Sequence, residues 1–280
     1  MILIADSGST KTEWNLMTNE KIVKSFFTSG INPFYQDSDA IYQSIQKEYP
    51  DIQTITPEYI YFYGAGCANE EKQQVVKTAL EKIFNTSKIE IGSDLLAAAR
   101  SLCQTESGIA CILGTGSNSC YYNGQSIESN VSPLGFILGD EGSGAILGKK
   151  LISDILKKQL PEPIIKRFYE TYPVTPTEIL DRVYKQPFPN RYLAQYTKFI
   201  SGNIQEKELE KLVSDGFKEF IIRNILQYPQ ASKVKIHVTG SIAFHFKDQL
   251  IDSLNYFNLQ IGRISQAPME NLIEYHKEQH

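Results

Sequence analysis

The sequence predicts an α/β protein of two lobes, with mixed sheets flanked by helices and a cleft between the lobes. Strand-like runs come first and helix–strand alternation follows, which is typical of a mixed sheet. An apolar strand, a turn of glycine and hydroxyl residues and a returning strand open the chain, and the same order recurs about a hundred residues later. The length of 280 residues is enough for two medium-sized domains. We therefore expect a first lobe over 1–106 and a second over 107–280.

The elements of the first lobe follow from the spacing of its apolar residues. Short β-branched and aromatic runs between turn residues predict strands. Apolar residues three and four apart, such as Val76, Ala79 and Leu80, predict helices, and Asn69 is a typical helix N-cap. The expected strands are 2–5, 13–17, 22–28, 59–63 and 88–91, and the expected helices are 37–49, 69–84 and 95–102.

The second lobe begins by repeating the opening pattern. A strand over 109–113, a turn over 114–119 and a returning strand over 120–122 match the first hairpin in order. A third small polar turn, Thr239-Gly240-Ser241, lies between a strand and a helix. The other expected elements are strands 234–238 and 257–261 and helices 145–159, 242–254 and 268–276, with mostly helical spacing over 161–227.

The opening turn, Asp6 to Thr12, has the composition of an anion site. Gly8 permits backbone conformations that a β-carbon forbids, and successive N–H groups in such a turn form a concave site for anions. Asp6 could hold a cation beside that anion. A β-hairpin with a polar tip explains the same residues, since Gly and Ser are common in turns, so the motif alone leaves both interpretations open.

Composition excludes several classes of function. The net charge of −4, without a long basic run, argues against nucleic acid or an anionic membrane as the main partner. No apolar stretch approaches the roughly 20 residues that span a bilayer, and the N-terminus lacks the pattern of a signal peptide. The four cysteines have no CxxC spacing, which favours buried thiols in a reducing cytoplasm over a metal or iron–sulfur site. We therefore expect a cytoplasmic protein.

The familiar single-loop motifs are missing as well. The segment 144–150 is one residue too short for a Walker A loop and ends in Lys. No GxGxxG opens a βαβ unit, and no GxSxG is present. The four histidines lie outside any metal or triad pattern. Three separate glycine turns remain, together with isolated carboxylates, and they point to nucleotide phosphates bound in a cleft.

Three motifs in order resemble a known superfamily. Asp6-Ser-Gly-Ser-Thr-Lys-Thr12, Leu113-Gly-Thr-Gly-Ser-Asn118 and Val238-Thr-Gly-Ser241 resemble the two phosphate motifs and the adenosine motif of the sugar kinases, actin and the heat-shock ATPases. Ser93-Asp94 and Gly139-Asp-Glu-Gly-Ser143 are most similar to the BadF/BadG-type ATPase family, N-acetylglucosamine kinase branch. The resemblance implies a duplicated ribonuclease H-like (actin-like ATPase) fold and an ATP-dependent, Mg²⁺-dependent kinase of an amino sugar.

The resemblance also implies roles for individual residues. Asp6 would bind Mg²⁺, directly or through water, and Asp94 would be the general base that accepts the sugar hydroxyl proton. Asn32, Asp94 and Asp140 would contact the sugar, with Gly135 and the Thr115-Gly116 backbone near its acyl group. The expected nucleotide contacts are Gly8, Ser9, Thr10, Lys11, Thr12, Gly114, Thr115, Gly116, Ser117, Asn118, Gly240 and Ser241.

Each of these assignments has a structural alternative. Asp94 could serve only as a negative residue at a helix start, and Asp140 could be the N-cap of the next helix. Asn32 could be a turn residue before Pro33, and Lys11 a solvated side chain at a hairpin end. At the level of function, a nucleotide-switched activator ATPase and a catalytically silent sugar sensor are the alternatives. Whether the protein forms a homodimer is also left open by the sequence.

The C-terminal segment departs from the family pattern. Longer relatives begin a helix there with small residues, whereas residues 267–272 here contain no glycine. Relatives also place aromatic residues before the Gly-Asp-Glu-Gly motif where this chain has Leu134 and Phe136. The sequence therefore leaves open how the nucleotide pocket is completed and which sugar is used.

Overall fold

The computed structural model describes residues 1–8, 10–18, 21–86 and 88–279. The chain forms two compact units, the first from Met1–Gln104 with Pro268–His280 and the second from Thr105–Ala267. The expected division at 106/107 differs chiefly at the C-terminus, because the closing helix belongs to the first unit and not to the second. Among the described residues, no helix is both long and apolar enough to cross a membrane.

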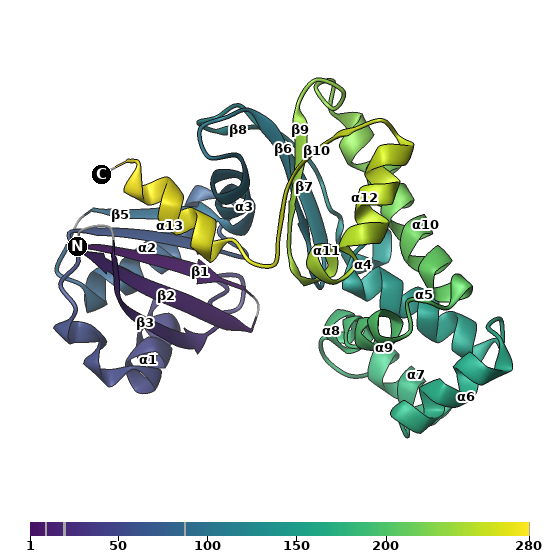
Figure 1. Ribbon diagram of the computed structural model, residues 1–280. Helices are drawn as coiled ribbons and strands as arrows, with labels where there is room; N and C mark the ends of the chain where they lie inside the picture. The colour runs from purple at the N-terminus through teal and green to yellow at the C-terminus, as the bar shows by residue number, and fades with distance from the viewer. Residues whose placement is uncertain (9, 19–20, 87, 280) are drawn as a thin grey trace. The chain divides into compact units, whose positions relative to one another are not determined.

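The first unit is built on a five-stranded mixed sheet of order β3-β2-β1-β4-β5 (Figure 1). β1 pairs antiparallel with β2 and parallel with β4, and β4 pairs parallel with β5. The carboxyl ends of β1, β4 and β5 are level, since Ser7 pairs with Gly64 and Gly64 with Ser93. The strands are β1 (Ile2–Ser7), β2 (Lys11–Thr18), β3 (Lys21–Ser29), β4 (Tyr59–Gly64) and β5 (Ile89–Ser93).

Alternate residues of β1 point to two different helical layers. Leu3 and Ala5 pack in one core with residues of α1 and α2, whereas Ile4 packs in another with residues of α3 and α13. Asp6 continues the alternation of Ile4 and therefore lies on the α3 face of the sheet. The helices of this unit are α1 (Ser38–Glu48), η1 (Pro50–Thr54), α2 (Glu70–Ile83), α3 (Asp94–Cys103) and α13 (Met269–Lys277).

The second unit repeats this topology. Its sheet, read from the β8 edge, has the order β8-β7-β6-β9-β10. This matches the first sheet's order β3-β2-β1-β4-β5 strand by strand. The antiparallel and parallel pairings also correspond, which confirms the predicted duplication. The strands are β6 (Gly108–Leu113), β7 (Ser117–Tyr122), β8 (Ile127–Val131), β9 (Lys235–Thr239) and β10 (Gln260–Ser265).

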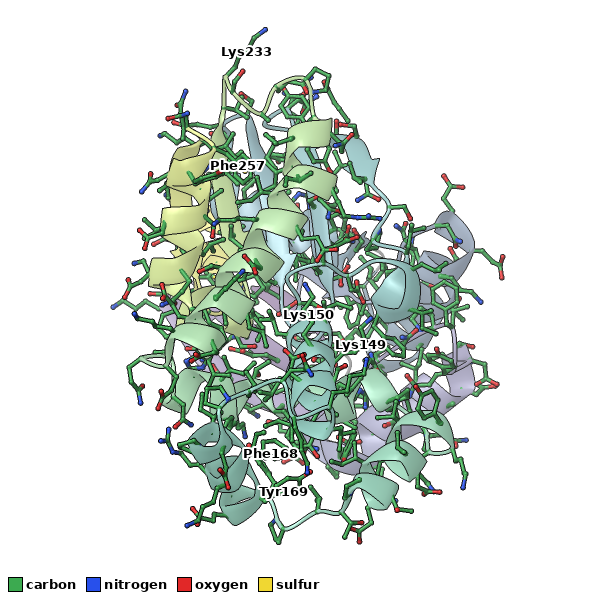
Figure 2. All side chains as sticks on the ribbon, turned by 90° about the vertical axis from the view of Figure 1, so that its right-hand side faces the viewer. Lys149, Lys150, Phe168, Tyr169, Lys233 and Phe257 are labelled. Atoms are coloured by element: carbon green, nitrogen blue, oxygen red, sulfur yellow. The ribbon has the colours of Figure 1, made fainter. Side chains whose placement is uncertain are left out.

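Helices account for most of the chain between β8 and β9. Two of them begin with proline, which suits the first helical position, and Thr175 and Glu178 form a capping box at α7. Phe168 of α6 is fully buried, with its ring edge-on to Phe199 at 5.4 Å, and lies near the lower end of Figure 2. These helices are α4 (Gly135–Leu138), α5 (Gly144–Leu156), α6 (Glu162–Thr171), α7 (Pro176–Tyr184), α8 (Pro189–Ala194), α9 (Thr197–Gly202), α10 (Lys207–Arg223) and η2 (Ile225–Gln227).

Two expected boundaries are wrong near the C-terminus. The single helix expected over 242–254 is broken at Phe246 into α11 (Ser241–His245) and α12 (Lys247–Tyr256). The last strand begins at Gln260 rather than at 257, because Asn258 has a left-handed backbone with φ 54° that ends the preceding helix. Both errors come from backbone turns that apolar spacing does not reveal.

Candidate active site

Two carboxylates lie at the level strand ends of the first unit. Asp6 is the penultimate residue of β1, and Asp94, directly after β5, is the first residue of α3. Both are half-buried, and they are close enough for their charges to repel. Burial, with a smaller contribution from Asp94, raises the pKa of Asp6 to about 7. Two half-buried carboxylates with a raised pKa mark this sheet edge as a candidate functional site.

Asp94 has a defined backbone environment. Its Oδ1 accepts the Leu95 N–H at 2.8 Å, and Ser93 caps the helix by accepting the Leu96 N–H at 3.1 Å. Burial raises the pKa of Asp94, and the Leu95 N–H partly offsets the shift. Asp94 is thus held at a helix start, but Ser93, not Asp94, provides the cap.

The thiol of Cys67 is affected by the same carboxylate. Burial and the nearby Asp94 charge raise the pKa of the Cys67 thiol to about 12, so this thiol stays protonated.

Asp6 suits a hard cation with few protein ligands. Within the described part of the chain, no group of three or more His, Cys, Asp or Glu residues could hold a metal by itself. Mg²⁺ usually takes one or two carboxylates and completes its shell with phosphates and water. Two half-buried carboxylates that repel each other fit that donor set, because a cation would relieve both the repulsion and the burial of charge.

The first glycine turn is tight and partly exposed. The Gly8 N–H donates to the Lys11 carbonyl at 3.0 Å, and Gly8, Thr10 and Lys11 are all exposed. The Lys11 ammonium lies 4.8 Å from the centre of the Phe27 ring. Ser9 lies outside the described residues. The turn therefore offers exposed groups to a ligand at Gly8, Thr10 and Lys11.

The Thr12 side chain is buried in the sheet, whereas the sequence predicts it to be a nucleotide contact. It has no exposed surface, and its hydroxyl bonds the Ser7 hydroxyl at 2.8 Å and donates to the Ser29 carbonyl at 3.0 Å. The Ser7 hydroxyl also accepts the Ile31 N–H at 2.9 Å. The expectation that Thr12 contacts phosphate is therefore wrong for its hydroxyl, which braces the hairpin against the chain after β3.

Asn32 is a turn residue that still has a free donor. Its Oδ1 accepts the Phe34 N–H at 3.0 Å, and its own N–H donates to Gln36 at 2.8 Å. A β-carbon built on Gly66 would come within 2.6 Å of this Oδ1, so a glycine is needed beside it. Among the residues that the structure describes, none accepts from the Asn32 side-chain amide. The turn alternative is thus correct for the oxygen, and the NH₂ group remains for a ligand.

Replacing Asp6 by asparagine should stabilise the protein without ligands at high pH. The folded pKa of about 7 exceeds the ordinary 3.8, so ionised Asp6 destabilises the fold above pH 7 and has no such effect below pH 3.8. We expect Asp6→Asn to gain up to about 4 kcal/mol at pH 8, with the gain falling to zero near pH 4. Urea unfolding at both pH values, with exposed Asp51→Asn as the control, measures this. A variant less stable than wild type at pH 8 would contradict the assignment.

The second glycine loop is fixed by the start of α5. The Gly144 and Ala145 N–H groups donate to the carbonyls of Gly114 and Thr115, at 2.8 and 3.0 Å. Within the loop, the Gly114 N–H donates a hydrogen bond to the Gly116 carbonyl at 2.9 Å. The peptide N–H groups of Thr115 and Gly116 have no partner among the described residues, so the loop has two free donors.

Asp140 is buried and joins this loop from the side. Its Oδ1 accepts the Ser117 N–H at 3.1 Å, and burial followed by the Glu141 charge raises the pKa of Asp140, against the effect of Ser117. Ser143, not Asp140, caps α5, so the N-cap alternative is wrong. Because Asp140 already accepts the Ser117 N–H, the predicted contact of Ser117 with the nucleotide is left to its hydroxyl and stays a prediction.

Two further predicted contacts of the second unit, Asn118 and Gly135, have different surroundings. The Asn118 side-chain oxygen accepts from Ser119 and from Asn130, both at 2.9 Å, so it braces β7 against β8. Gly135 is exposed and begins α4 with φ 73°. These two positions therefore differ: Asn118 is bound within the sheet, whereas Gly135 is open to a ligand.

The third turn requires glycine at position 240. Gly240 has φ 121°, and a β-carbon there would lie 2.3 Å from the Leu113 carbonyl oxygen. Its N–H donates to the Ser265 carbonyl at 3.0 Å, and Ser241 beside it is exposed. Because β6 and β9 are parallel and Ile112 pairs with Thr239, this turn and the second glycine loop lie at the same sheet edge.

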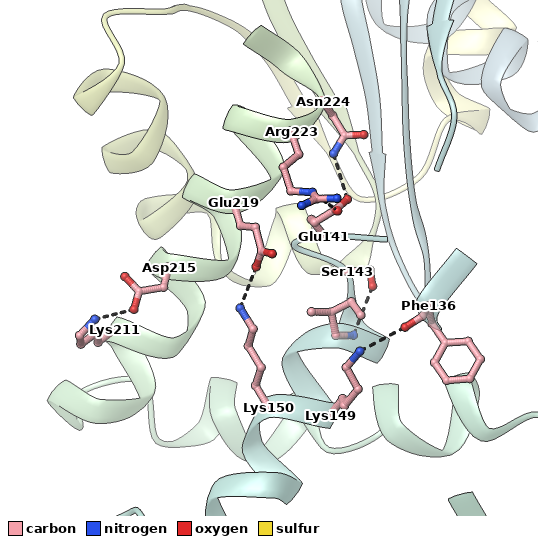
Figure 3. Close-up of polar contacts among 11 residues, drawn as sticks. Phe136, Glu141, Ser143, Lys149, Lys150, Lys211, Asp215, Glu219, Arg223 and Asn224 are labelled. Carbon is pink, nitrogen blue, oxygen red and sulfur yellow. Dashed lines mark hydrogen bonds and ion pairs between the residues drawn. The ribbon is translucent and has the colours of Figure 1, made fainter. Parts of the chain in front are cut away.

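Sequence reasoning gave no role to Glu141. This glutamate is 8% exposed, and its carboxylate pairs with Arg223 and accepts from Asn224 at 3.2 Å (Figure 3). The signal was present, since Glu141 lies inside the Gly139–Ser143 motif, but its partners are far away in the sequence.

The two units and their glycine turns define the class of actin-like ATPases and sugar kinases. No family model matches the chain. It is 43% identical to a solved protein from Porphyromonas gingivalis, provisionally named an N-acetylglucosamine kinase, with a TM-score of 0.94 and 100% of both chains covered. An N-acetylmuramic acid/N-acetylglucosamine kinase from Clostridium acetobutylicum is 20% identical over 220 residues, 74% of this chain and 71% of that protein.

A more distant structure shares the fold alone. A ROK family glucokinase from Streptomyces griseus, solved with glucose and AMPPNP, has a TM-score of 0.54 at 13% identity, covering 99% and 98% of the two chains. The full-length match at 43% identity settles the family. The chain belongs to the N-acetylglucosamine kinase branch of the BadF/BadG-type ATPase family, and thus to the sugar kinases.

Proposed function

We propose that the protein transfers the γ-phosphate of ATP to a hydroxyl of an amino sugar, with N-acetylglucosamine as the substrate. The observation that carries this is the pair of half-buried carboxylates, Asp6 and Asp94, at level strand ends in a chain of the sugar kinase family. Phosphoryl transfer needs charge neutralisation at the phosphates and a base at the acceptor hydroxyl, and two carboxylates can divide these tasks.

Asp94 is the proposed general base. It takes the proton of the sugar hydroxyl as the oxygen forms a bond to the γ-phosphorus and the bond to the leaving ADP oxygen breaks. Burial raises the pKa of Asp94, which makes its carboxylate a stronger proton acceptor than that of an exposed aspartate. Its position at the first turn of α3 keeps the carboxylate in one orientation.

The glycine turns are proposed to hold the nucleotide. Exposed groups of Gly8, Thr10 and Lys11, and the free N–H groups of Thr115 and Gly116, would donate to the phosphates. Gly240 and Ser241 would lie against the adenosine. Asp6 would hold Mg²⁺, which neutralises phosphate charge when bound.

The sugar contacts are assigned by their remaining hydrogen-bonding capacity. Asn32 has a free NH₂ donor, Asp140 has a second carboxylate oxygen beyond the one that accepts Ser117, and Gly135 is exposed. With Asp94 they offer both donors and acceptors to ring hydroxyls and an acyl group. The activator alternative is not favoured, because Cys111 and Cys120 are buried in the sheet and poorly placed for a cluster shared between subunits.

A sugar panel in a coupled ADP-release assay tests this proposal. We expect release of ADP from MgATP only when an amino sugar is added, with the highest kcat/KM for N-acetylglucosamine. N-acetylmuramic acid, N-acetylmannosamine and glucose are the informative competitors. Equal ADP release with and without sugar would support an ATPase instead, and sugar binding in calorimetry without turnover would support a sensor.

A further inference from the structure

The turn that carries Asp140 has an unfavourable backbone conformation. Asp140 has φ 56° and Gly142 has φ 71°, and a β-carbon on Gly139 would lie 2.1 Å from the Pro133 carbonyl oxygen. A residue other than glycine stays in the left-handed region only when its surroundings determine it. The contacts of this turn therefore decide where the Asp140 carboxylate lies.

Helix α10 supplies these contacts. A β-carbon on Gly142 would come within 3.0 Å of the Phe220 β-carbon, so the turn lies directly on the helix. At the end of α10, Arg223 pairs with the Glu141 carboxylate and Asn224 donates to it, as Figure 3 shows. Glu141 is 8% exposed, so this carboxylate is satisfied by its two partners rather than by water.

The residues at and after the end of α10 also hold β7, the strand that follows the second glycine loop. Tyr228 is 3% exposed, its hydroxyl lies 2.8 Å from that of Ser119 on β7, and it accepts the Val131 N–H at 2.9 Å. Residues 223–228 thus contact the Asp140 turn on one side and β7 on the other. Asp140 links the turn directly to β7, because it accepts the N–H of Ser117, the first residue of that strand.

We propose that Glu141, held by Arg223 and Asn224, is a positioning residue that sets the Asp140 carboxylate for the sugar. One Asp140 oxygen accepts the Ser117 N–H and fixes the loop, and no described residue donates to the other. This second oxygen is the one proposed to accept a sugar hydroxyl, and its direction depends on how the turn is anchored. This inference rests on the proposed function, because it assigns a task to Asp140 in sugar binding. It adds that a residue without substrate contact controls sugar affinity.

The experiment compares Glu141→Ala, Arg223→Ala and the double variant in the ADP-release assay. We expect each single variant to raise the KM for N-acetylglucosamine about tenfold, with kcat and the KM for ATP within about threefold of wild type. The double variant should be no worse than Glu141→Ala alone, because the half-exposed Arg223 has no partner in this turn once the Glu141 carboxylate is gone. Glu141→Gln, whose amide oxygen can still accept, should recover most of the sugar affinity.

Lys150→Ala is the matched control. Lys150 pairs with Glu219 at 2.9 Å and thus also joins α5 to α10, but it does not contact the Asp140 turn (Figure 3). It should leave the KM for the sugar unchanged. If Glu141→Ala does not fold, Arg223→Ala carries the test, since Arg223 is 56% exposed and its removal leaves the helix intact.

The outcomes separate the two proposals. Wild-type protein without sugar-dependent ADP release would overturn the proposed function and this inference with it. Sugar-dependent turnover in wild type, with the KM of Arg223→Ala and Glu141→Ala equal to that of Lys150→Ala, would overturn the inference alone. Equal losses in kcat, sugar KM and ATP KM would also overturn it, because they would indicate a general structural defect.

Discussion

Asp94→Asn should lower kcat about a hundred- to ten-thousand-fold, the usual contribution of a general base. Asparagine keeps the size of the side chain and an oxygen that can accept the Leu95 N–H, but it cannot take a proton. The nucleotide contacts are assigned to other residues, so ATP affinity should stay within about threefold of wild type. Single-turnover kinetics with saturating sugar, together with calorimetric titration of ATP, would measure both quantities.

The control for Asp94→Asn separates chemistry from helix stability. Ser93→Ala removes the hydroxyl that caps α3 and should cost about 1 kcal/mol of stability, yet it leaves the base in place. A carboxylate at the first turn contributes only about 0.5 kcal/mol through the helix dipole. If Asp94→Asn keeps the wild-type kcat, the residue serves the helix alone and the assigned base is wrong.

Gly240→Ala should damage both stability and nucleotide binding. Its φ of 121° is unfavourable for alanine, and the new β-carbon would lie 2.3 Å from the Leu113 carbonyl oxygen, so β6 or the turn must shift. We expect a loss of about 2–4 kcal/mol in the free energy of unfolding. Because the displaced turn adjoins the proposed adenosine site, the KM for ATP should rise about tenfold, while the KM for sugar should change less.

Gly202→Ala is the matched substitution in the same unit. A β-carbon there meets no atom within 4 Å, and the residue ends helix α9 without a left-handed backbone. We expect a change within about 1 kcal/mol and in the stabilising direction. Wild-type stability and wild-type KM for ATP in Gly240→Ala would show that the third turn neither needs a glycine nor borders the nucleotide.

The repeat of strand, glycine turn and strand made the duplicated fold predictable. Its local signals stand next to the strands of each hairpin: Gly8 directly follows β1, and Gly116 directly precedes β7. The sequence singled out Asp6 and Asp94 one by one, through the family resemblance, and did not place them together. Their common sheet edge follows from the parallel pairing of β1 with β4 and of β4 with β5, which the structure supplies.

Hydrogen-bond partners could not be predicted in the same way. Thr12 looks like a phosphate contact until Ser7 and Ser29 enclose its hydroxyl. The Ser117 N–H looks free until Asp140 accepts from it. Ser29 and Asp140 are 17 and 23 residues away from the groups that they accept from, and even nearby Ser7 lies on the neighbouring strand, so only the packed chain brings these partners together.

The closing helix illustrates a second limit. Its apolar face has the ordinary helical pattern, which does not say which sheet it covers. The structure packs Met269, Leu272 and Ile273 with Ile4 and Tyr63 of the first unit. Chain order alone had assigned this helix to the second unit, and the contacts with α3 and β4 correct that.

Transfer of labelled phosphate tests the central claim most directly. The protein would be incubated with ATP carrying ¹⁸O in its γ-phosphate, Mg²⁺ and N-acetylglucosamine, and the sugar would be analysed by mass spectrometry. The account predicts a phosphorylated sugar that carries the label, formed at least about a hundredfold faster by wild type than by Asp94→Asn. Labelled inorganic phosphate with unmodified sugar would contradict it.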